Sequence, residues 1–326
     1  MTDSLLEQRR RLSQQQLHEL SQQLNALPEV HCLPKLCVYA TGSYARNEAS
    51  EHSDIDLFFI HKGSSKTSKV AHLDELSLFA RVIEIGKRMK FPTFSNDGEF
   101  LKILYLEDML EMLGGREDDY QNSFTARMLL LLESSPLVNP SLLNEIFDSI
   151  VEAYFRDYPS HAADFRPVFL INDILRFWKT LCLNYENRRN RPDDDVAQKR
   201  KQQVKNFKLK FSRLMTCFGT IVAVCAKATP ISKADIVELG RITPLDRFLS
   251  VTSSISGLDA VRNAVLQDYE WFLQNTALST PELTALFDSS DTKIEMFRRA
   301  EVYGDRVYQV LKYFSERNGY TRYLIV

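Results

Sequence analysis

The sequence is short of the residues that mark several classes of protein. It has only 11 Gly and 11 Pro among 326 residues, which argues against a loop-rich β protein and against a disordered chain. Its five Cys are an odd number and form no CxxC pair, so we expect reduced thiols in a cytoplasmic protein and no zinc site. The six His form no HExxH motif, which agrees with that expectation.

Long apolar runs are missing as well. The best run, Leu214 to Ala226, is shorter than the stretch of about 18 residues that a membrane helix needs, and it continues into Lys227. The first residues contain no apolar core of the kind found in signal peptides. We therefore expect a cytoplasmic location and no membrane partner.

Neither sign of charge is in excess. Lys and Arg number 41 and Asp and Glu number 43, which gives a formal net charge of −2. No global basic field is present to hold a long nucleic acid, so we expect no long DNA partner. Binding of a nucleic acid would have to come from a local basic patch.

Strand signals are confined to the N-terminal part of the chain. The apolar run at 36–40 predicts a strand that enters a tight turn, and the segments 54–60 and 99–105 predict two more strands. An amphipathic helix is predicted at 4–27, and 70–89 has a helical pattern with one face made of Leu73, Leu76, Ala80 and Ile83. This α-β-β-α-β order fits one small mixed sheet with helices.

Helical periodicity dominates beyond about Leu106. We therefore predict an α+β fold that is mostly helical overall, with a mixed-sheet domain at 1–135 and an all-α domain at 136–326. Within the tract 124–133, Arg127 is expected to make a salt bridge between the two domains. The predicted helices cover 106–113, 121–134, 141–156, 166–187, 196–226, 232–239, 257–275 and 291–317, and the breaks between them include Pro136 and Pro281.

The segment from Thr41 to Asp56 carries the chemistry. Gly42-Ser43 follows a strand, where backbone N–H groups and a hydroxyl can hold an anion. Asp54 and Asp56 are two residues apart, so on a strand their side chains point to one face. Two carboxylates on one face repel each other unless a cation lies between them, and hard divalent ions with oxygen ligands suit such a site. A phosphate cradle beside paired carboxylates is what two-metal nucleotidyl transfer requires.

The segment GSYARNEASEHSDIDLFFI resembles the polymerase-β-like nucleotidyltransferase superfamily, whose signature is a strand, Gly-Ser, about ten residues, and Asp-hydrophobic-Asp. It looks most like bacterial signal-transduction members such as the PII-protein uridylyltransferase. The resemblance implies that Gly42 and Ser43 contact the nucleotide phosphates and that Asp54 and Asp56 bind two Mg²⁺ or Mn²⁺ ions. Arg46 is assigned either to a phosphate or to local support, and Glu48 to a structural pair.

The family also supplies a third carboxylate from a later strand, which takes the proton of the acceptor hydroxyl. Asp97 and Glu99 precede the third predicted strand, and the rest of that strand contains Lys102 and no acid. We favour Glu99 slightly over Asp97, and both residues are equally consistent with an ordinary turn. If neither reaches the metals, catalysis is weakened or the site only binds nucleotide.

A local basic patch is present at 199–213, which contains seven basic residues and no acid. The resemblance implies that a helical domain closes over the nucleotide and offers basic groups to the triphosphate. Lys208 and Arg213 are the best candidates for that role, although a run of charge is equally typical of a solvated helix face. RNA binding by this segment is an alternative with weaker support.

These observations predict a metal-dependent nucleotidyltransferase. It would move a nucleoside monophosphate from an NTP, bound in a cleft between the domains, to a hydroxyl on a protein, an RNA or a small molecule, and release pyrophosphate. The alternative from another class is a catalytically inactive, nucleotide-binding regulatory module of the same fold.

Overall fold

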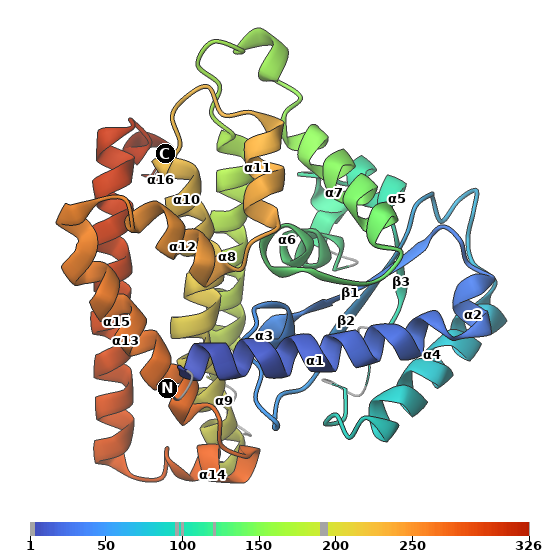
Figure 1. Ribbon diagram of the computed structural model, residues 1–326, viewed down its shortest axis with the longest axis horizontal. Helices are drawn as coiled ribbons and strands as arrows, with labels where there is room; N and C mark the ends of the chain where they lie inside the picture. Colours follow the sequence, from blue (N-terminus) through green and yellow to red (C-terminus); the bar gives the residue numbers. More distant parts are fainter. Residues whose placement is uncertain (1–3, 95–97, 99–100, 120–121, 190–194, 326) are drawn as a thin grey trace. The chain divides into compact units, whose positions relative to one another are not determined.

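The computed structural model describes residues 4–94, 98, 101–119, 122–189 and 195–325 (Figure 1). The chain divides into two compact units, Met1–Arg156 and Asp157–Val326, and each is described by itself. This division falls later than the boundary expected after residue 135. The reason is a strand that begins at Ser135 and pairs within the sheet of the first unit.

A four-stranded sheet forms the centre of the first unit. Its order is β3 (Ile103–Tyr105), β2 (Asp56–His61), β1 (Leu36–Thr41) and β4 (Ser135–Val138). Strand β1 is antiparallel to β2 and β4, whereas β2 and β3 are parallel. The predicted small mixed sheet and the α+β class are therefore confirmed.

Strand β4 was not expected, because Pro136 was interpreted as a break between helices. Proline lacks the backbone N–H that an inner strand needs, but it is tolerated on an edge strand. Here Pro136 lies opposite Tyr39 of β1, at the outer edge of the sheet.

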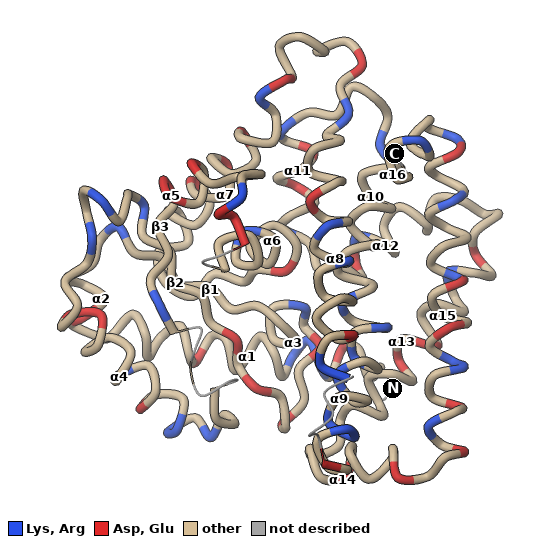
Figure 2. Tube along the Cα trace, turned by 180° about the vertical axis from the view of Figure 1, so that it is seen from behind, with Lys and Arg blue, Asp and Glu red and all other residues tan. Residues whose placement is uncertain are grey.

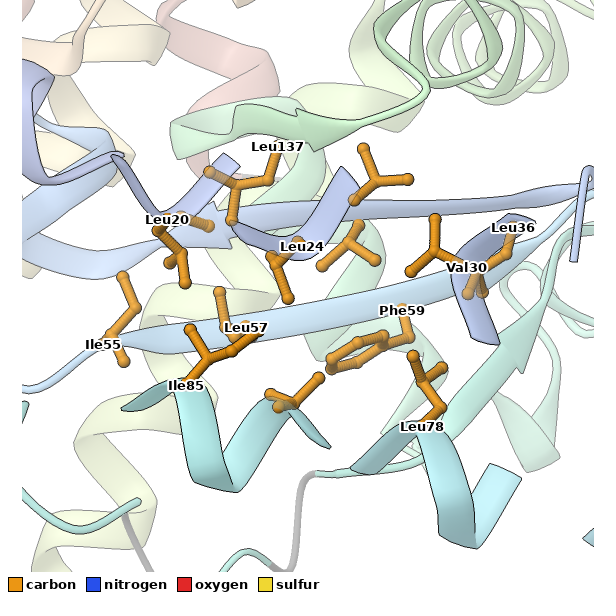
Figure 3. Close-up of a cluster of buried hydrophobic side chains, with 14 of the residues drawn as sticks. Leu20, Leu24, Val30, Leu36, Ile55, Leu57, Phe59, Leu78, Ile85 and Leu137 are labelled. Atoms are coloured by element: carbon orange, nitrogen blue, oxygen red, sulfur yellow. The ribbon is translucent and has the colours of Figure 1, made fainter. Parts of the chain in front are cut away.

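One face of the sheet is covered by α1 (Leu5–Asn25) and α4 (His72–Arg88) (Figure 1). Ser4 and Glu7 form a capping box that fixes the start of α1, and the buried Leu residues of α1 follow its helical period. Figure 3 shows how these helices meet the strands: Leu20 and Leu24 from α1 and Ile85 from α4 surround Leu57 of β2. This apolar cluster is the main core of the unit.

The opposite face is covered by α6 (Ser123–Glu133) and α7 (Pro140–Tyr154). The rings of Tyr39 and Phe58 stack on this face with centroids 5.6 Å apart. The Tyr39 hydroxyl donates a hydrogen bond of 3.1 Å to the carbonyl of Ala126 in α6. The unit also contains α2 (Pro28–His31), α3 (Gly42–Ala45), α5 (Leu106–Glu111) and the 3-10 helix η2 (Arg116–Asp119).

Arg127 is fully buried and pairs within the first unit. Its guanidinium donates two hydrogen bonds, of 2.7 and 2.6 Å, to the carboxylate of Asp118 and a third, of 2.9 Å, to the Tyr154 hydroxyl. The salt bridge between Arg127 and Asp118 lies within the first unit and ties η2 to α6, whereas a salt bridge between the domains was expected.

The second unit is entirely helical among its described residues, as the periodicity predicted. Three short helices, α12, α14 and α16, were not predicted. Helices α12 and α14 have a Pro in their first turn, where proline is tolerated, and Pro281 of α14 was interpreted only as a break between helices. The main helices are α8 (Val168–Arg189), α9 (Val196–Lys208), α10 (Thr220–Ala226), α11 (Lys233–Gly240), α12 (Pro244–Thr252), α13 (Asp259–Asn275), α14 (Thr280–Ala285), α15 (Ser290–Arg317) and α16 (Thr321–Ile325), and shorter 3-10 turns are η3 (Tyr158–Ser160) and η6 (Ser256–Leu258).

Two π-helical turns, η4 (Leu209–Arg213) and η5 (Met215–Gly219), join α9 to α10. The resulting span, Val196–Ala226, is long and apolar enough to cross a membrane by length and composition, with a mean hydropathy of 1.4 over its most apolar window. However, 72% of that window is buried by the protein. The span packs against α8, α12 and α15, which is the arrangement of a core helix.

Candidate functional site

The predicted Gly-Ser turn lies where β1 ends and the short helix α3 begins. Gly42 has a φ of +73°, a left-handed conformation that glycine adopts without the steric cost of a Cβ atom. The turn therefore directs the chain from the sheet into α3, and the half-buried Ser43 is placed in the first turn of that helix.

Asp56 lies directly beside Gly42. It is the first residue of β2, and its register partner is Thr41 at the end of β1. A Cβ atom on Gly42 would lie 2.8 Å from the Oδ2 atom of Asp56. The carboxylate therefore occupies the space that only a glycine leaves open. The structure thus brings the two halves of the motif together.

Asp54 precedes β2 and is exposed, whereas the strand was expected to begin at Asp54 itself. It lies close enough to Tyr44 of α3 to act on the ionisation of that residue: burial raises the pKa of the Tyr44 hydroxyl to about 12, and the negative charge of Asp54 adds to this effect. The Tyr44 ring packs edge-on against Phe91 at 5.4 Å. Tyr44 is therefore a neighbour of Asp54, and the sequence did not predict its place beside the site.

A buried network of charges holds the Gly-Ser turn. Glu133, at the end of α6, accepts a hydrogen bond of 3.1 Å from the Gly42 N–H and one of 2.9 Å from Arg46. Arg46 also donates a hydrogen bond of 2.8 Å to Glu48. All three charged side chains are buried. This geometry favours the local-support role for Arg46 over contact with a phosphate, and it agrees with a structural role for Glu48.

The loop between α3 and Asp54 is anchored by the N-terminal helix. Arg9 donates a hydrogen bond of 3.1 Å to the Ala49 carbonyl, and the Ala49 N–H donates one of 3.1 Å to the Ser13 hydroxyl. Both backbone polar groups of Ala49 are therefore satisfied by α1, which fixes the loop that leads into the acidic pair.

The candidates for the third carboxylate, Asp97 and Glu99, lie outside the described residues. The described part of the third strand starts at Ile103, which pairs with Phe59 in a parallel register. Within the described ranges, no group of three or more His, Cys, Asp or Glu side chains is arranged to hold a metal ion. The identity of the third acid therefore stays a prediction.

Lys208 and Arg213 belong to the second unit. Lys208 is the last residue of α9, and Arg213 ends the π-helical turn η4. Figure 2 shows basic residues at intervals along α8 and α9. Lys208 is exposed and Arg213 is half-buried, so both side chains reach the surface of this unit. That they contact a triphosphate stays a prediction from the sequence.

Comparison with protein families matches residues 20–135 to the nucleotidyltransferase domain. This range includes β1 to β3, the Gly-Ser turn and both aspartates. The chain therefore contains a nucleotidyltransferase domain, consistent with the polymerase-β-like superfamily that the motif resembles. The finer resemblance to PII uridylyltransferases stays a prediction.

The comparison with curated proteins found no match, and the comparison with solved structures found none either. The assignment of site residues therefore depends on the geometry of this chain.

Proposed function

We propose that the protein transfers a nucleoside monophosphate from an NTP to a hydroxyl group of an acceptor. In this reaction the acceptor oxygen bonds to the α-phosphorus, the bond from that phosphorus to the bridging oxygen breaks, and pyrophosphate leaves while the hydroxyl loses its proton. The presence of a nucleotidyltransferase domain supports this class of reaction and an NTP as donor. The observation that carries the proposal is the Asp56 carboxylate held against Gly42.

Asp54 and Asp56 fit the role of metal ligands. Mg²⁺ is usually bound in phosphoryl-transfer sites by one or two carboxylates together with substrate phosphates, and these two aspartates supply such oxygens beside the Gly-Ser turn. When bound there, Mg²⁺ or Mn²⁺ would neutralise charge on the triphosphate and increase the acidity of the acceptor hydroxyl.

The other residues of the site bind and orient. Because the Gly42 N–H donates to Glu133, we assign phosphate contact to Ser43 and a conformational role to Gly42. Arg46 and Glu133 keep the turn in the conformation that accommodates Asp56. Asp97 or Glu99 would take the proton of the acceptor. We keep the acceptor open among protein, RNA and small molecule, and a cytoplasmic location remains an expectation of the sequence.

A labelling experiment tests the proposal. The purified protein is incubated with a cell lysate, with Mg²⁺ or Mn²⁺, and with each of the four NTPs labelled at the α-phosphate. We expect transfer by the wild type and by Asp148→Asn, a control that removes an exposed charge on α7. Asp56→Asn should lower the rate by about 100-fold or more, because it removes a charge from the reaction site.

Two outcomes would count against the proposal. If Asp56→Asn transfers label as fast as the wild type, the site assignment is wrong. If no NTP yields label although calorimetry shows binding of Mg-NTP, the inactive nucleotide-binding module is the better description. Protease or ribonuclease treatment of the labelled product identifies the acceptor class.

A further inference from the structure

Helix α4 carries two apolar stripes, and only one of them is covered. Leu78, Phe79, Val82 and Ile85 are buried against the sheet and α1. The stripe predicted from the sequence, made of Leu73, Leu76, Ala80 and Ile83, faces outward instead: Leu73 is 77% exposed and Leu76 is 51% exposed, while Ala80 is exposed and Ile83 is half-buried. We call these four residues the outer stripe.

We propose that the outer stripe binds a second copy of this chain, with the two α4 helices antiparallel across a two-fold axis near Ala80. The spacing of the stripe is three, four and three residues, which is the a/d pattern of a short helix–helix seam. In an antiparallel pair, Leu76 of one copy packs near Ile83 of the other. The small side chain of Ala80 at the centre lets the two helices approach closely.

The charges of α4 favour this orientation. Its first turn carries the exposed Asp74 and its last turn the exposed Lys87. The other two charges of these turns are engaged within the chain, since Glu75 accepts a hydrogen bond from the Ile103 N–H and Arg88 donates to Gln23 of α1. An antiparallel pair places each acidic turn beside the basic turn of the other copy, whereas a parallel pair places like charges together. The helix dipoles favour the same arrangement. Neither Asp74 nor Lys87 makes an ion pair with another described residue in the single chain.

The border of the stripe also argues against a lipid surface as its occupant. Helices that lie on membranes have a basic polar face. The outer face of α4 carries mixed charges, including the Arg81–Glu84 ion pair of 2.9 Å. A surface of mixed charge that complements itself is suited to an isologous contact, in which the same patch serves both copies.

The size of the stripe predicts a weak dimer. Four side chains from each copy bury less than the roughly 1,200–2,000 Å² that stable complexes usually bury, so a dissociation constant in the micromolar range or above is expected. The inference is independent of nucleotide transfer, because it concerns α4 and not the Gly-Ser turn.

Sedimentation equilibrium of the full chain over roughly 5–500 μM tests the proposal in the concentration range that a weak contact requires. The average mass should rise from 37.7 kDa toward twice that value. Leu76→Glu should weaken association at least tenfold, because it places a charge in the seam. Leu183→Glu, which alters a leucine that is 68% exposed on α8, is the matched control and should leave association unchanged. Circular dichroism confirms that both variants are folded.

Charge reversal at the two ends tests the orientation. Asp74→Lys and Lys87→Glu should each weaken self-association several-fold at low salt, because each places like charges together. An equimolar mixture of the two variants should form a heterodimer as tight as the wild-type dimer, since both end contacts then join opposite charges.

Three results would overturn the proposal. A wild-type mass of 37.7 kDa at every concentration excludes the dimer. Equal association of Leu76→Glu and the wild type places the contact elsewhere on the chain. Association that needs lipid vesicles, with none in their absence, assigns the stripe to a membrane surface instead.

Discussion

Gly42 meets two requirements that no other residue type meets at once. Its φ of +73° is unfavourable for residues with a Cβ atom, and the space beside its Cα is filled by the Asp56 carboxylate. The residue therefore couples the shape of the turn to the position of an acid that is 14 residues further along the chain. One hydrogen bond, donated by the Gly42 N–H to the Glu133 carboxylate, completes this arrangement.

Gly42→Ala should lower nucleotidyl transfer at least tenfold, because the new methyl group displaces Asp56 and strains the turn. The cost of the left-handed conformation is about 1–2 kcal/mol, so the protein should stay folded with a reduced Tm. Transfer of α-labelled NTP and thermal unfolding measure the two effects separately. Gly257→Ala is the control, since no atom lies within 4 Å of its added Cβ. Unchanged transfer by Gly42→Ala would contradict the role given to this turn.

The sequence could predict those site residues that lie close together along the chain. Gly42, Ser43, Asp54 and Asp56 follow from one spacing, and the structure places Gly42 and Asp56 side by side. Glu133 could not be predicted in this way, because its partner Gly42 is 91 residues away and an acid at the end of an apolar helix has no distinctive local pattern.

At the scale of elements, the sequence predicted helices better than strands. Apolar periodicity locates a helix, but it does not say which face is covered, and α4 has two apolar stripes of which the predicted one is exposed. Strand β4 is only four residues long and contains Pro136, so its position depends on pairing with β1 and not on its own pattern. Tertiary contacts decide which stripe of α4 is covered and where β4 forms.

The buried pair of Asp118 and Arg127 joins two elements, η2 and α6, and it makes a quantitative prediction. Asp118→Asn should lower the free energy of unfolding by about 3–5 kcal/mol, because the fully buried guanidinium loses the negative charge of Asp118. Urea unfolding followed by circular dichroism measures this value. Glu117→Gln alters the exposed neighbouring acid and should have little effect. A loss below about 1 kcal/mol for Asp118→Asn would show that the pair adds little to the stability of the fold.

At the scale of the whole molecule, each unit contains its own core. The apolar cluster of the first unit is built from residues between Leu17 and Val138. The second unit has an aromatic cluster in which Phe211 stacks on Phe272 at 4.8 Å and on Tyr303 at 4.5 Å. Both units are also of the size at which single domains commonly fold.

We therefore expect the fragments 1–156 and 157–326, produced separately, each to show a cooperative thermal transition. The first fragment contains the Gly-Ser turn and both aspartates and should bind Mg-NTP. If Lys208 and Arg213 contact the triphosphate, as the sequence predicts, this fragment should bind at least about tenfold more weakly than the full chain, because charge-assisted hydrogen bonds are lost.

Calorimetry on the fragment and on the full-chain variant Lys208→Ala, Arg213→Ala measures this difference. If the fragment and the double variant lose the same affinity for Mg-NTP, the weaker binding is due to these two basic groups and not to the missing unit as a whole. If the fragment binds as tightly as the full chain, the basic run is a solvated helix face, and the phosphate contacts must come from the first unit. Neither result bears on the role of Asp56, because that role is tested by the rate of nucleotidyl transfer and not by the affinity for Mg-NTP.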